Sequence, residues 1–321
     1  MSIGYNLCKS VLYGGNIVFK VKFWGVRGSI PCPGPTTAKY GGNTSCIQII
    51  SDLGYQIILD AGSGIRDLAG FLLSNPEFKK PLKIYLFLTH THWDHIMGFP
   101  FFVPIYIPTS EIDIYGPVTF EDDPLEKVVG GQLTYRYFPI RFDELSANIN
   151  YHRLQETQPT NPDTILNLPG GMTIKFKYLN HPVSCLGYRF EYQGKVFATC
   201  YDHEPFANLF EDDPENREEG QMASDEQNQK VAEFYSGADL LVHDSQYTTK
   251  EYQKYKGWGH STYKYAITQA LKGGVKKLAL FHHDPNRTDA QLESLKAEYE
   301  GKFSQFGLDV FPCYEKQEIE L

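Results

Sequence analysis

The pattern of hydrophobic and polar residues in the first third of the chain predicts short β-strands with one helix among them. Hydrophobic and polar residues alternate over residues 17–25, as they do in a strand with one buried face. Further strands are predicted at 46–50, 56–59 and 82–88. The spacing of apolar residues over 65–73 is that of an amphipathic helix.

The second half of the chain repeats this alternation of strands and helices. A Gln-Gly pair at 193–194 separates two strand-like runs and predicts a β-hairpin. The predicted elements are strands at 172–179, 185–192, 195–199, 240–243 and 277–281, and a helix at 264–271. Strands that alternate with helices indicate a layered α/β fold.

Two segments show no clear periodicity. Residues 118–165 contain several Pro and aromatic residues, and we interpret them as an insertion. Residues 204–230 hold nine Asp or Glu against two Lys or Arg, which is typical of a solvated, mobile loop. We therefore predict a single domain over residues 1–321 with insertions near 118–165 and 204–230, and residues 1–16 give no prediction.

Composition and charge restrict the class of protein. The chain is 41% hydrophobic and 21% charged, as expected for a globular protein with a core. Its formal net charge of −9 disfavours a long nucleic acid as partner, because proteins that hold such a backbone usually carry a basic surface. The six cysteines are scattered without a CxxC pair, which indicates reduced thiols. Neither a signal peptide nor a long apolar run is visible, so we expect a cytoplasmic protein without a membrane partner.

The segment Thr-His-Thr-His-Trp-Asp-His, residues 89–95, carries the chemistry that stands out. His90 and His92 point the same way in an extended chain, so both can reach one metal ion. The chain then turns, and Asp94 and His95 can face a second position beside the first. Imidazole is a preferred ligand of zinc-like ions, and a carboxylate suits a second or harder ion.

Three more ligand-type residues follow predicted strands further along the chain. His181, Asp202 and His282 each come within three residues of the end of a strand, where α/β sheets assemble their sites. The complete set supplies two metal sites with Asp202 as a bridge: His90, His92 and His181 for one ion, and Asp94, His95 and His282 for the other.

Two divalent ions held in this way would supply a nucleophile at neutral pH. Metal binding lowers the pKa of water from about 15.7 towards 7, so a metal-bound hydroxide can attack an electrophile. We expect zinc in both positions. Manganese and iron also accept ligand sets of His and Asp.

The segment His-Thr-His-Trp-Asp-His resembles the HxHxDH signature of the metallo-β-lactamase superfamily, and the order of motifs fits that family over residues 17–310. The resemblance implies an α/β fold of the αββα four-layer sandwich type, with two mixed sheets inside, helices outside and the metals along one edge. It also implies that Asp60 supports the metal-binding loop from behind the ligands.

Two further residues indicate a branch of this superfamily. A bridging Asp202 argues against true β-lactamases, whose second site typically uses other ligands. Asp244 and the later Gly-His-Ser-Thr at 259–262 resemble a paired motif of tRNA 3′-processing endonucleases and related phosphodiesterases. The resemblance implies that Asp244 orients His260, which protonates the departing oxygen. Together with Asp94, these two residues are our expected catalytic residues. The same Gly-His-Ser-Thr segment also fits a helix N-cap.

The glycine-rich segments near the N-terminus also resemble those of phosphodiesterase-like members, including phosphoribosyl cyclic phosphodiesterases and cyclic-nucleotide phosphodiesterases. Glycines let backbone N–H groups approach an anion, and Arg27 or Asn43 can add donors there. Arg287 is a further candidate for a phosphate contact, and His283 for a place behind the ligands or against substrate. A tight structural turn explains the glycines equally well.

These features favour a dinuclear metal-dependent phosphodiesterase that acts on a small cyclic or nucleotide phosphodiester. An RNA-processing nuclease is the first alternative, and it requires a basic surface near the cleft. An ester or thioester hydrolase is a second alternative, because a two-metal hydroxide also attacks carbonyls. A non-catalytic binding member of the fold is a third. The resemblance leaves a homodimer open, since relatives often pair.

Overall fold

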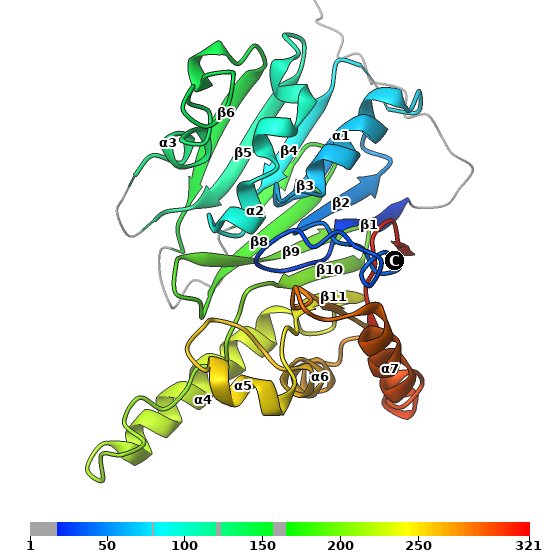
Figure 1. Cartoon of the computed structure of the whole chain (residues 1–321). Coiled ribbons are helices and arrows are strands. Elements are labelled where there is room, and N and C mark those ends of the chain that lie inside the picture. The colour runs from blue at the N-terminus through cyan, green and yellow to red at the C-terminus, as the bar shows by residue number, and fades with distance from the viewer. Residues whose placement is uncertain (1–17, 79, 120–122, 157–164) are drawn as a thin grey trace, which may run out of the picture.

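The computed structural model describes residues 18–78, 80–119, 123–156 and 165–321. Within these ranges two seven-stranded β-sheets pack face to face, and helices cover their outer faces (Figure 1). The αββα sandwich expected from the sequence is therefore confirmed. The N-terminal residues 1–16, Ile17 of the first predicted strand, Cys8 and two stretches of the predicted insertion, 120–122 and 157–164, lie outside the described residues.

The first sheet has the strand order β14-β1-β2-β3-β4-β5-β6. Its first four strands in this order pair antiparallel, and the pairs from β3 to β6 are parallel. The strands are β1 (Phe19–Gly25), β2 (Cys46–Ser51), β3 (Gln56–Leu59), β4 (Lys83–Phe87), β5 (Glu111–Pro117), β6 (Asn148–Leu154) and β14 (Glu318–Glu320).

The second sheet has the order β13-β12-β11-β10-β9-β8-β7. The strands from β10 to β13 pair parallel, and those from β7 to β10 pair antiparallel. The strands are β7 (Ile165–Leu168), β8 (Met172–Leu179), β9 (Cys185–Tyr192), β10 (Lys195–Cys200), β11 (Leu240–Asp244), β12 (Lys277–Phe281) and β13 (Asp309–Pro312).

Helices cover both outer faces of this pair of sheets (Figure 1). One hydrophobic core lies between the two sheets. Each sheet has one further core between its outer face and the helices that cover it. The α-helices are α1 (Ile65–Ser74), α2 (Trp93–Ile96), α3 (Leu125–Gly130), α4 (Arg217–Phe234), α5 (Thr249–Tyr255), α6 (Tyr263–Lys272) and α7 (Asp289–Tyr299). Four short 3₁₀ helices complete the described elements: η1 (Phe99–Phe101), η2 (Val103–Tyr106), η3 (Phe142–Glu144) and η4 (Ser304–Phe306).

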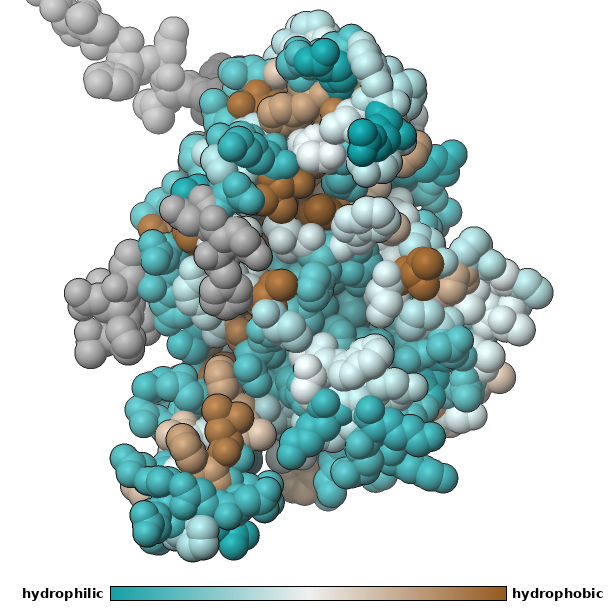
Figure 2. Space-filling view, turned by 60° about the vertical axis from the view of Figure 1, so that its left-hand side comes forward, coloured by the Kyte–Doolittle hydropathy of each residue, from teal (hydrophilic) through white to brown (hydrophobic). Residues whose placement is uncertain are grey.

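The acidic segment 204–230 is not the loop that its composition predicts. Its second half forms most of α4, an 18-residue helix, and with the residues just before it makes an arm that projects from the body (Figure 1). We call residues 207–230 the acidic arm. Figure 2 shows hydrophilic surface over much of this arm, with a small hydrophobic group on it. The prediction of a loop was wrong because α4 is polar on most of its faces, which hides the helical period.

The other segment without periodicity contributes to the first sheet. After α3 and η3, the chain forms β6, which pairs with β5 over its whole length at the edge of the sheet. The organisation into one domain with two insertions stays a prediction. Among the described residues, no helix is both long enough and apolar enough to cross a membrane.

Candidate metal centre and active site

The candidate site lies where strands of both sheets end at the same edge of the sandwich. In the first sheet, β4 delivers His90 three residues after its last residue. In the second sheet, β8, β10 and β12 deliver His181, Asp202 and His282 within two residues of their ends. The seven predicted ligand residues are therefore brought together from segments that lie up to 192 positions apart, between His90 and His282.

The first group of potential ligands consists of His90, His92, His181 and Asp202, whose ligand atoms lie within 4.8 Å of one another. Asp202 Oδ2 lies 3.4 Å from His90 Nε2 and 3.8 Å from His181 Nε2. His181 Nε2 lies 3.1 Å from His92 Nδ1. These four residues include all three histidines that the sequence assigned to the first ion.

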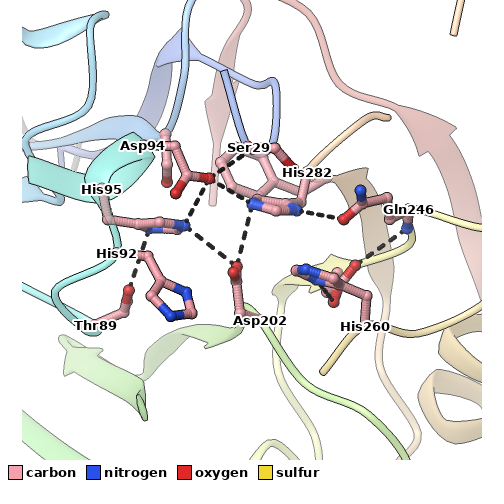
Figure 3. A network of polar contacts seen from close by, with 12 residues as sticks. Ser29, Thr89, His92, Asp94, His95, Asp202, Gln246, His260 and His282 are labelled. Carbon is pink, nitrogen blue, oxygen red and sulfur yellow. Dashed lines mark hydrogen bonds and ion pairs between the residues drawn. The ribbon is translucent and has the colours of Figure 1, made fainter. Parts of the chain in front are cut away.

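The second group consists of Asp94, His95 and His282, with Asp202 beside it (Figure 3). Asp94 Oδ2 lies 3.4 Å from His95 Nε2 and 3.2 Å from His282 Nε2. Asp202 Oδ1 lies 3.4 Å from each of the same two nitrogens. Asp202 thus turns one carboxylate oxygen towards each group, an orientation that suits a ligand shared by two ions.

The spacing of the donor atoms suits coordination of metal ions better than hydrogen bonding between these side chains. Ligands about 2.0–2.2 Å from a tetrahedral ion lie roughly 3.3–3.6 Å apart, and most of the distances above match this spacing. The atoms His90 Nε2, His95 Nε2 and Asp202 Oδ1 are buried and lack a hydrogen-bond partner among the described residues. Orphaned polar atoms of this kind are costly unless something else satisfies them. Divalent cations would do so.

Three of the imidazoles are oriented by a hydrogen-bond contact of Nδ1, the ring nitrogen that faces away from the cluster. His95 Nδ1 lies 2.7 Å from Asp60 Oδ2, and His181 Nδ1 lies 3.0 Å from the carbonyl oxygen of Gly259. His282 Nδ1 lies 3.1 Å from Gln246 Oε1 (Figure 3). Such partners fix the tautomer and the orientation of a ligating imidazole, so Nε2 faces the shared space.

Burial and charge set the protonation states of these groups. Burial lowers the pKa of His90 well below 6.5 and that of His181 to about 4, which leaves both rings in the neutral form that binds metal. Burial also disfavours the charged form of His95, but the surrounding carboxylates outweigh it and raise the pKa of His95. Burial alone would raise the pKa of Asp94, yet His95 and His282 hold it well below its usual range.

Backbone strain accompanies the residues at this edge. Five described non-glycine residues have a positive φ, and Ser29, Asp60 and His282 are three of them, with φ between 59° and 65°. Asp60 and His282 follow β3 and β12 directly, so the left-handed residue turns the chain at the strand end. Gly28 packs against His282 so closely that an added Cβ would lie 2.3 Å from its ring.

Asp60 takes the place behind the ligands that the resemblance implied. Its carboxylate accepts hydrogen bonds from the backbone N–H of Thr89 at 2.7 Å and from the Thr89 hydroxyl, besides its contact with His95. It therefore ties β3 to the loop that carries four potential ligands. Sequence reasoning missed two comparable partners, Ser29, whose N–H donates to Asp94 Oδ2 at 2.7 Å, and Gln246.

His260 and Asp244 form the predicted pair beside the second group. His260 Nδ1 lies 2.9 Å from Asp244 Oδ2, and the His260 ring stacks on that of His282 at 4.9 Å. Burial would lower the pKa of His260, but the Asp244 carboxylate outweighs burial and raises it to about 9. His260 therefore carries a proton in this environment. The helix-cap interpretation also holds, because Thr262 Oγ1 accepts from the N–H of Tyr265 at the start of α6.

The residues proposed as anion donors have other partners. Arg27 is fully buried and donates from Nε to Gly41 O at 2.7 Å and from Nη1 to Arg287 O at 2.6 Å. Asn43 donates to Glu315, so it too is part of the packing of the N-terminal loop. These contacts favour the structural interpretation of the glycine-rich segments over a phosphate contact of Arg27 or Asn43.

The two candidates after β12 are also structural. Arg287 is buried and forms a two-pronged ion pair with Glu251, at 2.6 and 3.0 Å, which ties the start of α7 to α5. His283 is buried, and its Nε2 lies 2.9 Å from the carbonyl oxygen of Cys313. His282 alone of these neighbours reaches the two groups of potential ligands.

Comparison with known proteins decides the family. A model of the beta-lactamase superfamily domain matches residues 55–283, which include every potential metal ligand named above. The chain belongs to the beta-lactamase superfamily. Ribonuclease Z of Lactococcus lactis subsp. lactis (strain IL1403) is 29% identical over 238 residues, which cover 63% of this chain and 72% of that protein.

Solved structures of superfamily members share the fold across nearly the whole chain. The short form of human tRNase Z superposes with a TM-score of 0.61 at 19% identity, and the match covers 94% of this chain and 98% of that one. A diphosphatase from the PhnP family superposes with a TM-score of 0.62 at 16% identity, covering 94% and 97%. With its family and its cluster of ligand-type residues, the chain is a metal-dependent hydrolase.

Proposed function

We propose that this hydrolase cleaves phosphodiester bonds of RNA with two divalent ions, zinc being the ion we favour. The pair of His260 and Asp244 beside the metal-ligand cluster carries the proposal, because an alkoxide leaves badly without a proton and this pair is placed to give one. The names of the relatives, ribonuclease Z and tRNase Z, support RNA as the substrate class.

In this proposal each of the two ligand groups described above would hold one ion, and Asp202 would serve both. When bound, the ions would polarise the phosphoryl oxygen and lower the pKa of water near it. Asp94 is a ligand whose position is fixed by the N–H of Ser29. Zinc suits five imidazoles and two carboxylates, although manganese and iron share this preference.

His260 has the geometry of a proton donor to the leaving oxygen. Since its Nδ1 faces Asp244, its Nε2 remains for the substrate. A ring nitrogen of His260 lies within 4.8 Å of the ligand atoms of Asp202 and His282, so a phosphate at the ions would sit within reach of it. Asp244 acts through His260, and the backbone N–H groups of His203 and Ser261 hold its carboxylate in place.

A small nucleotide phosphodiester is the second candidate substrate. The net charge of −9 and the acidic arm, which begins five residues after Asp202, oppose a long polyanion. A diester with one or two nucleotides escapes most of this repulsion, because exposed charges are screened beyond about 10 Å at 0.1 M salt.

The test is turnover by the metal-loaded protein on a short RNA, on 2′,3′- and 3′,5′-cyclic nucleotides and on bis(p-nitrophenyl) phosphate. We expect diester cleavage by the wild type, with RNA preferred. Asp202→Ala should lose cleavage of every substrate, whereas His260→Ala should lose cleavage of RNA and of the cyclic nucleotides, whose leaving oxygens need a proton. The Leu209→Ala variant is the control, since Leu209 is 90% exposed on the acidic arm.

Two results would redirect the proposal. Cleavage of cyclic nucleotides but not of RNA would select the small substrate. A protein that binds two ions and leaves every diester intact would refute phosphodiester hydrolysis, and panels of esters and thioesters would then test the carbonyl alternative.

A further inference from the structure

Three aromatic side chains form a continuous ladder from the proposed proton donor to the surface. The Tyr247 ring lies 6.0 Å from that of His260, and Tyr255 stacks on Tyr247 with centroids 4.9 Å apart and planes within 14°. Trp258 meets Tyr255 edge to face at 5.2 Å. Tyr247 is buried, whereas Trp258 is 61% exposed, so the ladder ends in an indole that faces solvent.

The loop that carries Trp258 is held rigidly against the site. The N–H groups of Gly257 and Gly259, on either side of the tryptophan, both donate to the buried carboxylate of Glu204, at 2.7 and 2.8 Å. Both glycines have a φ near +87°, a backbone that a side chain would strain. At Gly259 an added Cβ would also lie 2.2 Å from His181 Nδ1. The backbone on both sides of the exposed indole is thus fixed by a buried network.

This fixed exposure sets Trp258 apart from the tryptophan of the core. Trp24 is 5% exposed and packs on Phe71, as a side chain with this much apolar area usually does. Trp258 leaves most of its area in water although it sits one residue from a group bonded to His181. A large aromatic surface held open beside an active site is suited to bind a flat aromatic group.

We propose that Trp258, backed by Tyr255, stacks on the nucleobase of the leaving nucleotide. This inference rests on the proposed phosphodiester hydrolysis. His260 is placed at the departing oxygen and the ladder starts at His260. Since Tyr247 is buried, a base on the departing group would meet the ladder at its exposed end, Trp258. Every nucleobase has an aromatic face, so stacking of this kind tolerates any base. Trp258 is therefore a specificity-determining residue that selects diesters with a base on the leaving side.

The kinetic test uses two dinucleotides with the same scissile phosphate. Products from the wild type first identify the half that leaves, and the second substrate carries an abasic ribose in that half. We expect Trp258→Ala to lower kcat/KM for the base-bearing substrate by roughly 5- to 150-fold, mainly through KM, and to leave the abasic substrate unchanged. Trp258→Phe should restore most of the loss, because it keeps an aromatic face.

The matched control is Phe306→Ala, which removes another aromatic side chain with 66% exposure, on η4. It should leave both substrates unchanged. Equal losses on the two substrates in Trp258→Ala, or no loss on either, would overturn the inference while leaving the hydrolysis itself in place.

A binding measurement separates failure of this inference from failure of the proposed function. In a Trp93→Phe background the indoles left are those of Trp24 and Trp258, since the chain has three tryptophans. Adenosine should quench their fluorescence and ribose should not, and Trp258→Phe in this background should abolish the quenching. Quenching that persists without Trp258, or its absence with Trp258 present, would refute the stacking site even if no diester is cleaved.

Discussion

Five histidines serve the same cluster, but they do so with different ring nitrogens. His90, His95, His181 and His282 turn Nε2 towards Asp202 or Asp94, and the partners on Nδ1 include a carboxylate, a backbone carbonyl and an amide. His92 instead presents Nδ1 to the first group. These choices matter chemically, because the partner of one nitrogen fixes the tautomer and the basicity of the other.

Asp244→Asn tests whether the His260 pair acts on the leaving group. The substitution keeps the size of the side chain but removes the charge that favours protonated His260. We expect kcat to fall by about 10²- to 10⁴-fold for a diester with a nucleoside leaving group. The loss should be less than about tenfold for bis(p-nitrophenyl) phosphate, because nitrophenolate departs without a proton.

The comparison of the two substrates is decisive for Asp244. Equal losses on both would assign Asp244 a purely structural role, since its carboxylate also accepts the backbone N–H groups of His203, Gln246 and Ser261. Circular dichroism and metal content of the variant provide the check that the fold and the ion sites persist.

At the scale of elements, the site depends on the short connection between α5 and α6 as much as on strand ends. Glu204 follows Asp202 by two residues and accepts hydrogen bonds from Tyr252 of α5 and from the loop at Gly257 and Gly259. A single buried carboxylate thereby ties the end of β10 to the segment that presents Trp258 and His260.

Glu204→Gln should weaken this tie. The amide offers one acceptor oxygen to three donors and adds a donor of its own, so at least one buried N–H or O–H group loses its partner. We expect the free energy of unfolding to fall by about 1–3 kcal/mol, measured by urea denaturation. KM for the base-bearing dinucleotide should rise in parallel.

The control for this substitution is Glu211→Gln, an exposed position on the acidic arm that should change neither quantity. If Glu204→Gln and the wild type have the same midpoint of urea denaturation, the three hydrogen bonds contribute no net stability.

For the whole molecule, ions that bind only the folded chain must stabilise it. The folded state gathers seven potential ligands from both sheets, whereas the unfolded chain separates them. Removal of the ions by a chelator should therefore lower the melting temperature. The free energy of unfolding should fall by about 4 kcal/mol for each ion that had been present at 1,000 times its Kd.

Calorimetry with and without chelator measures this effect, and Asp202→Ala serves as the comparison because it removes the shared ligand. The variant should melt at nearly the same temperature in both conditions. A wild type whose melting is insensitive to chelator and to added zinc would argue that the cluster holds no ion.

The distribution of charge over the molecule makes a separate prediction about substrate size. Glu211, Asp212 and Glu215 are exposed on the acidic arm. Replacing all three by Gln should lower KM for RNA by about three- to tenfold at low salt, with a smaller effect at high salt. KM for a cyclic nucleotide should stay constant, and steady-state kinetics at two salt concentrations distinguish the cases. If KM for RNA is unchanged at both salt concentrations, the acidic arm has no role in substrate choice.

The chain's own sequence determined the central strands and the residues of the candidate site. The runs that became β1 to β4, β8 to β12, α1 and α6 are recognisable, because one buried face gives a periodic pattern and two buried faces give a continuous apolar run. The seven ligand-type residues are predictable from their side chains and their places after predicted strands, where α/β sheets assemble sites. Asp60, Asp244 and His260 are predictable from the resemblance to the family.

Only the tertiary structure decided what surrounds that set. The helix α4 and the short strands β7, β13 and β14 have weak patterns, because few of their residues are buried and packing against neighbours determines them. Ser29, Glu204 and Gln246 act through hydrogen bonds across large sequence separations, which no local pattern encodes. Arg27 and Arg287 show the converse. Each has a guanidinium that could bind a phosphate, but its hydrogen bonds go to other parts of the chain. These partners lie up to 260 positions away, so a local pattern does not reveal them.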